Sequence, residues 1–549
     1  MKLFNKYKSV LTPQDKKQRK KERILALTSG IFIGIAFPPL PFPYLIFFAL
    51  IPYLYVLNKR ETLTEINRIT YLTAFVFTLI TLYWVGSWTK EADPFLMISG
   101  ILLMFVNPAL YLIPSTLFYF AKKSIGKNAA FFIFPFFWVS FEFAYSLTDL
   151  RFPWLTLSNS LPKFNLFIQI ADIVGAYGIS LIILFINLFT FLFINEISSS
   201  RKLRKTYFAF ALGLFFIPII YGFIRIKTYK VSEEKVKVGL IQPNFNPWDK
   251  WEAGNVNEQL DLYLNMSSEA VKKNAKVIVW PESALPVYLF SGNYPYEVQR
   301  IHEFSDSNDV FVLTGMPDVQ FFFDEKEAPS DAKVSKISKT KYVSYNSILL
   351  FSPQSRTVQK YGKIKLVPFG EHVPFVEHLP FLGDLIKWQV GISSWNVGKE
   401  QTVFNLIEGI ELNIAGVVCI ESIYPDFVAG FVQKGANLIA VVTNDSWYGY
   451  SSGPFQHKEI SAIRAIENRR SVVRSANGGV SCLIDPLGRT LQSTKLFERD
   501  ILVVDAPIEN RMTFYSKFPL TIPLISSFIS IFIITLYYYC KLFKKHSLK

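Results

Sequence analysis

The stretch LNIAGVVCIESIYPD, from Leu412 to Asp426, decides how the second half of the chain is interpreted. An apolar run rich in β-branched residues leads to Cys419 and Glu421, and the sequence then turns polar. This pattern predicts a buried strand that delivers one side chain to the edge of a site. Free cysteine is also among the most buried residue types, so these residues alone leave a structural role for Cys419 open.

The composition indicates a membrane protein. The chain has 549 residues, half of them hydrophobic, with 52 phenylalanines and a mean hydropathy of +0.26. Such values suit neither a disordered chain nor a typical soluble enzyme. The formal net charge of +15 comes from short basic runs beside apolar segments, which is a topology signal of membrane proteins. No nucleic-acid recognition motif accompanies the charge, so we expect no nucleic-acid partner.

Long apolar segments predict about eight membrane spans. The segments lie near residues 24–37, 43–57, 71–89, 95–121, 129–146, 166–194, 207–225 and 518–540. No small-residue cleavage site follows the first segment, and further apolar segments come at once, so we interpret it as an uncleaved span rather than a signal peptide. The first two segments are short and joined by PPLPFP, which also allows a re-entrant pair.

Basic residues in the connections indicate the orientation. One set of connections, which includes both chain ends, holds 23 Lys and Arg residues, whereas the alternate short connections hold 3. Short cytoplasmic loops carry the excess of positive charge in membrane proteins. The pattern predicts both termini in the cytoplasm, a membrane domain over residues 1–227, an outer domain over 228–515, and a last span with its tail over 516–549.

One ionisable residue, Glu142 in WVSFEFAY, is expected at or near the depth of the bilayer. Such residues are costly in a membrane and are functional candidates by default. The alternative interpretation is a residue near the outer interface that only caps or hydrogen-bonds its neighbours.

The outer segment has the pattern of an α/β domain. Strand-like runs alternate with helical patterns at about 256–273, 294–306 and 455–470. The runs are KVKVGLIQP, AKVIVWPES, VFVLTGMP, YNSILLFSP, LNIAGVVCI, LIAVVTND, SVVRSANGG and ILVVDAP. This alternation predicts sheets stacked in layers and covered by helices. The polar residues 322–343 are expected to form a mobile loop.

Three strand ends carry residues with catalytic chemistry: Glu282 in WPES, Lys363 and Glu371 in YGKIKLVPFGE, and Cys419 in VVCIES. A thiol with an ordinary pKa of about 8.5 is mostly protonated at neutral pH, so it needs a base. A carboxylate such as Glu282 can take that proton and return it to a leaving group. An ammonium group such as Lys363 can stabilise the oxyanion that forms when a carbonyl is attacked. Together these groups suffice for acyl transfer through a thioester.

Sequence spacing does not show that these residues meet. When each residue is considered alone, a structural role is the favoured interpretation: a strand-end cap for Glu282 and a solvated surface charge for Lys363. The other two cysteines, Cys482 and Cys540, are too scattered relative to Cys419 for a disulfide framework or a structural zinc site. We therefore expect neither a metal nor a cofactor.

Taken in order, WPES, the YxK motif with LVPFGE downstream, and C-x-E after an apolar strand resemble the nitrilase superfamily of carbon–nitrogen hydrolases. With its membrane spans and the segment LVPFGEHVPF, the chain more closely resembles the bacterial apolipoprotein N-acyltransferase family. The similarity extends over nearly the whole chain and includes FPWL at 152–155, GAYGIS at 175–180, TNDSW at 443–447, QH at 456–457 and IDPLGR at 484–489. The resemblance implies a polytopic α-helical membrane domain joined to a nitrilase-like α/β domain, an αββα sandwich.

The resemblance also implies a ping-pong reaction. The family's base falls on Glu282, its lysine on Lys363 and its nucleophile on Cys419, which form a Glu-Lys-Cys triad. The thiol takes an acyl chain from a membrane phospholipid and passes it to the N-terminal amine of the diacylglyceryl-cysteine of an apolipoprotein. The implied location is the bacterial inner membrane, with the catalytic domain on the periplasmic side, and the expected form is a monomer.

Three further residues are implied to support the triad. Glu371 and Glu421 fall on two further glutamates of the family, and they are expected to orient Lys363 and keep it charged. Asn346 in YNS is a candidate hydrogen-bonder at the same site. Ile420 departs from the family, which often has tyrosine between the cysteine and the glutamate.

Residues 372–395, rich in Phe, Leu, Ile and Trp, follow the lysine and glutamate motif directly. They form either ordinary core or an amphipathic arm that dips into lipid, and we favour the arm because of its position. Two rival functions are a membrane-tethered amidase that hydrolyses its thioester with water and a transporter with an outer sensor domain. Hydrolysis needs no eight-span scaffold, and the spans show no repeated pair of Gly/Pro-broken segments, which argues against both.

Overall fold

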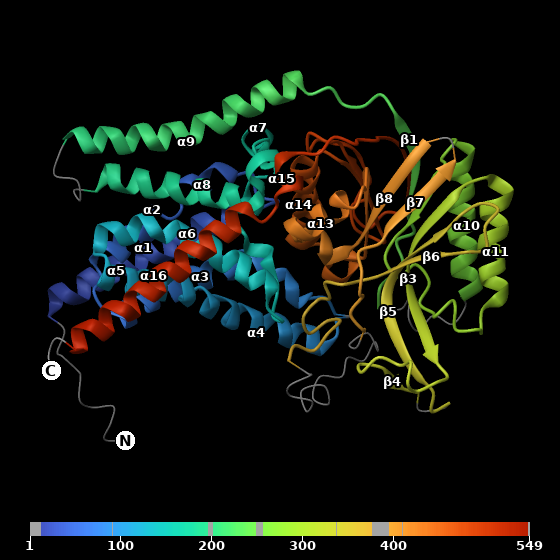
Figure 1. Ribbon diagram of the computed structural model, residues 1–549, viewed down its shortest axis with the longest axis horizontal. Coiled ribbons are helices and arrows are strands. Elements are labelled where there is room, and N and C mark those ends of the chain that lie inside the picture. Colours follow the sequence, from blue (N-terminus) through green and yellow to red (C-terminus); the bar gives the residue numbers. More distant parts are fainter. Residues whose placement is uncertain are drawn as a thin grey trace.

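The computed structural model describes residues 12–90, 92–195, 201–248, 256–335, 338–375, 395–408 and 410–546. A bundle of long helices forms one end of the molecule, and an α/β domain with two sheets forms the other (Figure 1). The predicted combination of a helical membrane domain and a layered α/β domain is confirmed. Most of the expected lipid-facing arm, residues 376–394, lies outside the described residues.

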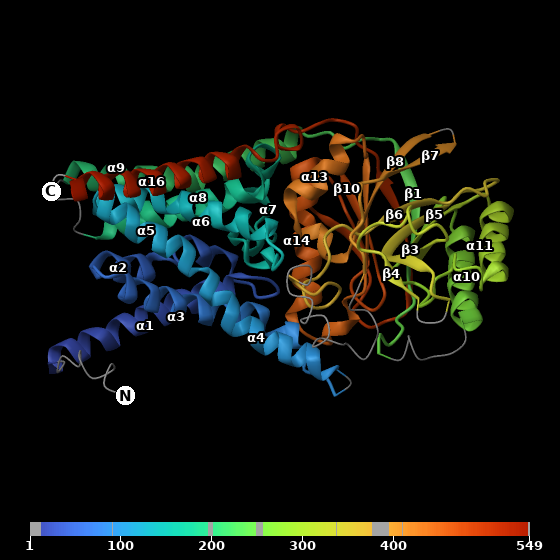
Figure 2. The same cartoon turned by 60° about the horizontal axis from the view of Figure 1, so that its bottom comes forward.

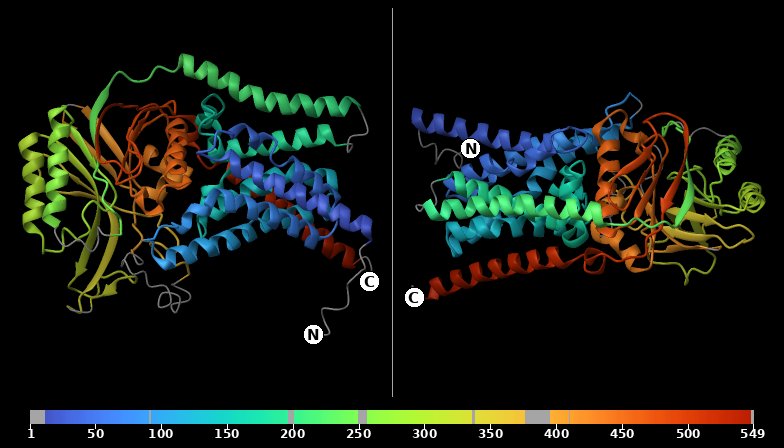
Figure 3. Two further views of the ribbon diagram at one scale, coloured as in Figure 1. Left: turned by 180° about the vertical axis from the view of Figure 1, so that it is seen from behind. Right: turned by 90° about the horizontal axis from the view of Figure 1, so that it is seen from above.

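Helices make up the described first part of the chain. They are α1 (Pro13–Ala36), η1 (Pro43–Phe47), α2 (Ile51–Lys59), α3 (Leu63–Leu82), η2 (Tyr83–Gly86), α4 (Pro94–Leu110), α5 (Leu112–Ser124), α6 (Lys127–Leu147), η3 (Pro153–Leu155), η4 (Leu157–Ser160), α7 (Asn165–Ile168), α8 (Ala171–Ile194) and α9 (Arg201–Thr228). A final helix, α16 (Thr521–His546), follows the α/β domain and packs against α5 and α6. The start of α1 and the end of α16 both lie at the end of the bundle away from the sheets (Figure 3).

Within the described residues, six helical segments are long and apolar enough to cross a membrane. They are Leu63–Gly86, Pro94–Ser124, Lys127–Leu147, Ala171–Ile194, Leu203–Thr228 and Thr521–Tyr539. Each overlaps a predicted span. The two remaining predicted spans lie on α1, which begins inside the basic amino-terminal run, and on the short apolar helix Pro43–Lys59. The total of eight spans therefore stays a prediction.

Helix α4 starts at a strong sequence signal. The Asp93 side chain accepts a hydrogen bond from Phe95 N at 2.7 Å, and Pro94 occupies the first turn, where its missing N–H costs nothing. Pro108 follows near the end of the helix, and α5 begins directly after Tyr111. These signals mark the two ends of α4, which extends from the bundle toward the α/β domain (Figure 2).

The α/β domain contains two sheets. The first has the strand order β13-β1-β2-β3-β5-β4, with β6 paired to β5, and the second has the order β12-β11-β10-β9-β8-β7. β1, β2 and β3 run parallel, as do β8, β9 and β10, so the carboxyl ends within each set lie at one edge of its sheet. The strands are β1 (Lys235–Gln242), β2 (Val277–Trp280), β3 (Phe311–Phe322), β4 (Lys333–Val334), β5 (Lys341–Phe351), β6 (Gln359–Gly362), β7 (Val403–Glu408), β8 (Ile410–Val418), β9 (Leu438–Thr443), β10 (Ser471–Ala476), β11 (Cys482–Ile484), β12 (Thr490–Ser493) and β13 (Asp500–Pro507).

The two sheets stack against each other, with helices on both outer sides. β1, β2 and β5 of the first sheet contact β10, β9 and β8 of the second. Helices α10 (Val256–Lys272) and α11 (Pro295–Asn308) cover the first sheet, and α13 (Pro425–Gln433) and α14 (Ser452–Asn468) lie between the second sheet and the bundle (Figure 2). β9 is buried along its whole length, which explains its continuous apolar sequence. The expected αββα sandwich is confirmed.

The polar residues 322–343 contain strands where the sequence predicts a mobile loop. β3 extends to Phe322 and pairs with β5 from Lys341, and β4 adds a short strand beside β5. The prediction of a loop was wrong at both ends of this range. Strands at the edge of a sheet are held by backbone pairing and can carry polar side chains, so the polar sequence did not indicate them. The Phe323 side chain directly after β3 is 91% exposed.

The chain enters and leaves the α/β domain on neighbouring strands. β1, which follows α9, pairs antiparallel with β13, and Lys235 lies opposite Pro507. From β13 the chain continues through the short helix α15 (Phe514–Lys517) into α16. Both connections to the bundle therefore start from one edge of the first sheet.

Contacts near the end of α14 fix the α/β domain to the bundle. Arg469, directly after α14, donates to Asp172 Oδ2 of α8 at 2.7 Å, and both side chains are buried. Glu467 accepts a hydrogen bond from Ala176 N at 2.7 Å, next to Gly175, whose φ of +65° interrupts α8. Because buried charges are strongly destabilising without their partners, these contacts hold the two parts in one relative position.

Candidate active site

Three residues of the site follow strands whose carboxyl ends meet. Glu282 comes after β2 of the first sheet, and Cys419 and Asn444 come after β8 and β9 of the second. Cys419 begins a short 3-10 helix, η5 (Cys419–Ile423), and adopts a left-handed conformation with a φ of +51°. Such a conformation is costly for a residue with a side chain and persists only where its surroundings hold it, as at many functional positions.

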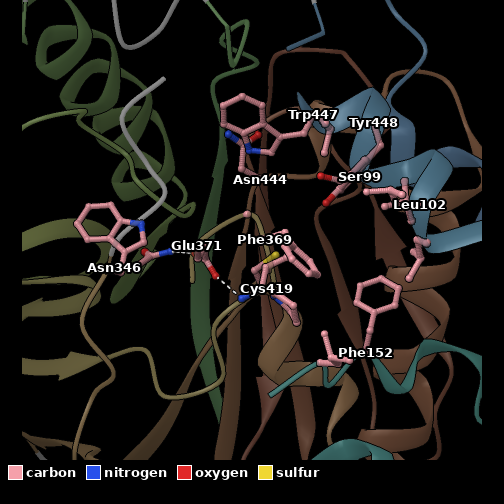
Figure 4. A pocket seen from close by; sticks show the side chains of 18 of the residues that line it. Ser99, Leu102, Phe152, Asn346, Phe369, Glu371, Cys419, Asn444, Trp447 and Tyr448 are labelled. Carbon is pink, nitrogen blue, oxygen red and sulfur yellow. Dashed lines mark hydrogen bonds between the residues drawn. The ribbon is translucent and has the colours of Figure 1, made fainter. Parts of the chain in front are cut away.

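Lys363 lies between two carboxylates. Its Nζ is 3.3 Å from Glu282 Oε1 and 2.7 Å from Glu371 Oε2, and the side chain is fully buried. Asn346 joins the same group, since its Nδ2 donates to Glu282 Oε1 at 2.8 Å and to Glu371 Oε1 at 2.7 Å. The structure therefore brings four of the predicted site residues into one hydrogen-bonded cluster, part of which is drawn in Figure 4.

Backbone groups orient both carboxylates. Asn444 N donates to Glu282 Oε2 at 3.0 Å, and Val367 N donates to Glu371 Oε2 at 2.9 Å. Each carboxylate thus has one oxygen on the backbone and an oxygen shared between Lys363 and the Asn346 amide. This arrangement holds the charged groups in place through direct hydrogen bonds.

Glu421 supports Lys363 through the backbone rather than through the ammonium group. Its Oε1 accepts hydrogen bonds from the Tyr361 hydroxyl and from Ile364 N, both at 2.7 Å. Its Oε2 accepts from Val418 N at 2.9 Å. Glu421 therefore joins the loop that carries Lys363 to the strand that ends at Cys419, and its buried carboxyl has a raised pKa because burial outweighs these hydrogen bonds.

Lys363 is charged and the Cys419 thiol is neutral at neutral pH. Burial opposes a charge on Lys363, but the carboxylates of Glu371 and Glu282 outweigh it and raise the lysine pKa, so Lys363 stays an ammonium ion. Burial and then the Glu282 carboxylate raise the pKa of the Cys419 thiol above its ordinary value. The thiol is therefore protonated at neutral pH, so it can act as a nucleophile only if a base removes its proton.

The clustered residues line one cavity of about 310 Å³. From the α/β domain, Glu282, Lys363, Glu371 and Cys419 face it. The opposite side comes chiefly from the membrane helix α4, whose contribution is Leu96, Ser99, Leu102, Leu103, Val106, Asn107 and Leu110. Figure 4 shows Ser99 and Leu102 on the far side of the cavity from the polar cluster. A polar cluster thus faces a largely apolar wall across the cavity.

Glu142 is not among the residues that line this cavity. Its Oε1 accepts hydrogen bonds from Trp138 Nε1 at 3.2 Å and from Leu157 N at 3.0 Å, which joins α6 to η4. Of the two interpretations of this residue, the structure favours the one in which it hydrogen-bonds its neighbours.

Comparison with known proteins decides the family. Residues 237–511 match the carbon-nitrogen hydrolase family model, and residues 29–189 match the model of the apolipoprotein N-acyltransferase N-terminal domain. An apolipoprotein N-acyltransferase from Chlorobaculum tepidum is 34% identical over 510 residues, which cover 91% of this chain and 93% of that protein. The chain belongs to the apolipoprotein N-acyltransferase family.

Other relatives agree with this assignment. An apolipoprotein N-acyltransferase from Geobacter metallireducens is 28% identical over 505 residues, which cover 91% of this chain and 92% of that protein. Among solved structures, an amidase from Nesterenkonia sp. covers 51% of this chain and 92% of its own, with 17% identity and a TM-score of 0.36. The apolipoprotein N-acyltransferase relatives thus match the membrane and the α/β domains together.

Several site residues escaped the sequence prediction. Asn444, Trp447 and Tyr448 line the cavity beside Cys419, although TNDSW entered only as part of the family resemblance. His457 of the QH pair lies 3.1 Å from the Cys419 carbonyl oxygen through its Nε2. In the part of the chain that is described, no group of three or more His, Cys, Asp or Glu side chains is placed to hold a metal ion.

Proposed function

We propose that this acyltransferase moves an acyl chain from a membrane phospholipid to the N-terminal amine of the diacylglyceryl-cysteine of an apolipoprotein. One observation carries the proposal: a thiol, a carboxylate and an ammonium group line a cavity whose opposite side is a membrane helix. A small water-soluble amide needs no such surface, whereas the chain of a lipid does. The names of the relatives support the same transfer and do not favour an amidase.

In the first half-reaction, Cys419 attacks the ester carbonyl of the phospholipid. Glu282 takes the thiol proton as the C–S bond forms, and Lys363 stabilises the oxyanion on the former carbonyl oxygen. The intermediate collapses with cleavage of the C–O bond, and Glu282 returns the proton to the departing alkoxide. The products are an acyl thioester on Cys419 and a lysophospholipid.

In the second half-reaction, the amine of the lipoprotein attacks the thioester carbonyl. Glu282 takes a proton from the amine, the C–N bond forms and a second oxyanion develops next to Lys363. The C–S bond then breaks, and the thiolate receives the proton from Glu282. The enzyme returns to its starting state, and the lipoprotein carries an amide-linked third chain.

Glu371, Asn346 and Glu421 are proposed to position the reacting groups rather than to exchange protons. The contacts of Glu371 and Asn346 with Lys363 and Glu282 set the distance between base and ammonium group. Glu421 keeps the Lys363 loop against the end of β8. Such preorganisation spares the enzyme the reorganisation of these groups during the reaction.

The cavity opens toward the space that lipid chains would occupy. Leu102 and Val106 line the cavity and are also 57% and 48% exposed. Side chains that are exposed within an apolar helix of spanning length face the hydrocarbon of a bilayer. An acyl chain can therefore reach Cys419 sideways from the membrane, past α4.

Multiple apolar helices and the relatives indicate an inner-membrane protein. For its orientation, we propose cytoplasmic termini and a periplasmic α/β domain. The distribution of basic residues supports this orientation. The start of α1 and the end of α16 also lie at the end of the bundle that is farther from the sheets, which agrees with termini and α/β domain on different sides of the membrane (Figure 3). We propose further that one copy of the chain is sufficient for the reaction.

The test uses purified protein in vesicles of a defined phospholipid. Mass spectrometry is expected to find one acyl chain on Cys419, and addition of a diacylated lipopeptide should remove that chain and produce the N-acylated peptide. Cys419→Ser should lose the adduct, whereas the control Cys482→Ala, which changes a buried thiol outside the cavity, should keep it. Release of free fatty acid without N-acylated peptide would contradict the transferase and support the amidase.

A further inference from the structure

Two side chains in the wall of the cavity each have one polar atom without a partner. Among the described residues that line the cavity, only Asn346 Oδ1 and Trp395 Nε1 are buried polar atoms that form no hydrogen bond. The two side chains are 3% and 8% exposed. A buried donor or acceptor without a partner destabilises a folded protein, so such an atom beside a reaction centre is a candidate for contact with a substrate.

The orientation of the Asn346 amide follows from its carboxylate partners. Its Nδ2 donates to Glu282 Oε1 and to Glu371 Oε1. The opposite orientation would place the amide oxygen against two carboxylate oxygens, which only accept hydrogen bonds. Asn346 Oδ1 therefore points away from both carboxylates and offers an acceptor on the same amide group that binds the base Glu282.

The backbone holds Trp395 beside the strand that carries Asn346. Trp395 N donates to the Glu371 carbonyl oxygen at 3.2 Å, and the next residue, Asn396, donates through its N to the carbonyl oxygen of Ser344 in β5 at 2.7 Å. The Tyr288 ring packs edge-on against the indole, with 6.2 Å between centroids. An indole N–H only donates hydrogen bonds. The wall therefore offers one unpaired donor and one unpaired acceptor on neighbouring segments.

This donor and acceptor match the second substrate better than the first. The ester and phosphate oxygens at the reacting end of a phospholipid only accept hydrogen bonds, so they leave Asn346 Oδ1 without a partner. The N-terminal residue of a peptide carries both kinds of group, because one α-carbon joins its amine, which donates, to its carbonyl group, which accepts. The diacylglyceryl-cysteine of a lipoprotein has this same pair of groups.

We propose that Trp395 and Asn346 bind the N-terminal residue of the acceptor. Trp395 Nε1 donates to the carbonyl oxygen of that residue, and Asn346 Oδ1 accepts one hydrogen of its neutral amine. The amine then lies beside Glu282, which takes the other hydrogen as a proton while the C–N bond forms. The C–S bond breaks, and Glu282 passes the proton to the sulfur of Cys419. The amide product keeps the one hydrogen that is bound to Asn346.

The test compares Trp395→Phe with the unchanged full-length protein, in vesicles of phosphatidylethanolamine, on two acceptors. One is a diacylated lipopeptide, and the other is S-diacylglyceryl cysteamine, which keeps the amine but lacks the carbonyl group. Phenylalanine keeps an aromatic ring and removes the N–H. Transfer to the lipopeptide is expected to fall about two- to tenfold, as for the loss of one hydrogen bond, with no change for the cysteamine compound. Equal slowing of both acceptors would overturn the proposal.

A second measurement follows the acylation of Cys419 before any acceptor is added. The effect of Trp395→Phe should be confined to the transfer step, because the phospholipid is not the ligand of the indole. Slower acylation of Cys419 would overturn the proposal, and slower acylation by phosphatidylethanolamine but not by phosphatidylglycerol would assign the pair to the amine of the head group. If the variant does not fold, the unchanged protein decides: the cysteamine compound should react more slowly than the lipopeptide, and equal rates would overturn the proposal.

This inference rests on the proposed acyl transfer, and the same assay keeps the two apart. If the unchanged protein forms no acyl adduct on Cys419, or forms it and produces no N-acylated lipopeptide, the proposed function fails. If the unchanged protein produces the N-acylated lipopeptide and Trp395→Phe does so at the same rate, only the acceptor site fails.

Discussion

The two sides of the cavity are built in opposite ways. The polar wall, formed by Glu282, Lys363, Glu371 and Cys419, belongs to the α/β domain, and its charged groups are buried and hydrogen-bonded to one another or to the backbone. The apolar wall, formed by the α4 residues that line the cavity, includes the exposed side chains of Leu102 and Val106. The polar wall holds a few polar atoms in fixed positions, whereas the apolar wall provides a larger area of apolar contact.

This difference matches the role that the proposed function gives to each wall. A charge that develops during a reaction is stabilised best by groups that already point at it, so small displacements of these groups lower the reaction rate strongly. An acyl chain has no polar atoms to recognise, and its binding depends roughly on the apolar area that is removed from water. Substitutions in the polar wall should therefore lower the reaction rate strongly. Substitutions in the apolar wall should weaken lipid binding by smaller amounts that depend on the apolar area lost.

The largest effect is expected for Glu282→Gln. The amide keeps the shape of the side chain but cannot take the thiol proton, so the rate of N-acylation of a lipopeptide should fall about a hundred- to ten-thousandfold. Glu142→Gln is the matched control, because it changes a buried glutamate that does not line the cavity. If Glu282→Gln acylated the lipopeptide at the same rate as the control, Glu282 would not be the base.

Glu371→Gln should act less strongly. It leaves Lys363 beside Glu282 but replaces the closer carboxylate, whose hydrogen bond to a charged group is worth about 1.5–3 kcal/mol, or about ten- to a hundredfold in rate. The loss should appear in kcat for lipopeptide acylation, with little change in KM for phospholipid. A change confined to KM would instead make Glu371 a substrate-binding residue.

The pH dependence of thiol alkylation tests the resting state of the polar wall. Because burial and Glu282 raise the pKa of Cys419, the thiolate fraction should grow about tenfold per pH unit from pH 7 to 9, without a plateau. In Glu282→Gln a repulsive charge is gone, so the thiol pKa should fall and the iodoacetamide profile should move to lower pH. A plateau below pH 8 in the unchanged protein would contradict a raised pKa.

The smallest effect is expected on the apolar wall. Ser99→Trp fills part of the cavity, whereas Ile98→Trp changes an exposed neighbour that does not line it. Each methylene group excluded from the cavity costs ~0.8 kcal/mol, or about fourfold in KM for phospholipid. Alkylation of Cys419 by a small reagent should be unaffected in both variants. Equal effects of the two substitutions would mean that the lipid does not pass α4.

The sequence predicts the polar wall far better than the apolar wall. Glu282 and Cys419 each stand where an apolar run meets a polar turn, which draws attention to them, and the order of the motifs in the family resemblance adds Lys363. Ser99 and Leu102 lie in a helix that is apolar on all sides. Lipid-facing and cavity-facing positions carry the same residue types there, and only the packing of α4 beside the α/β domain tells them apart.

Contacts that side chains make with backbone groups are the second feature that could not be predicted from the sequence. Glu421 was expected to orient Lys363, but nothing in its position along the chain indicates that it would do so by binding Ile364 N and Val418 N. The same holds for His457, which reaches the carbonyl oxygen of Cys419 rather than a side chain. Residue types predict which side chains can react, whereas backbone partners depend on how the chain turns.

The pairing of β1 with β13 bears on how a protein of this kind can originate. Because Lys235 and Pro507 lie opposite each other, the two ends of the α/β domain are as close as adjacent strands allow. A domain with neighbouring ends can be inserted into another protein with little disturbance of either one. A soluble ancestor could thus have been recruited to the membrane as a single cassette between two helices, and exchange of the whole cassette between relatives offers the same route to new variants.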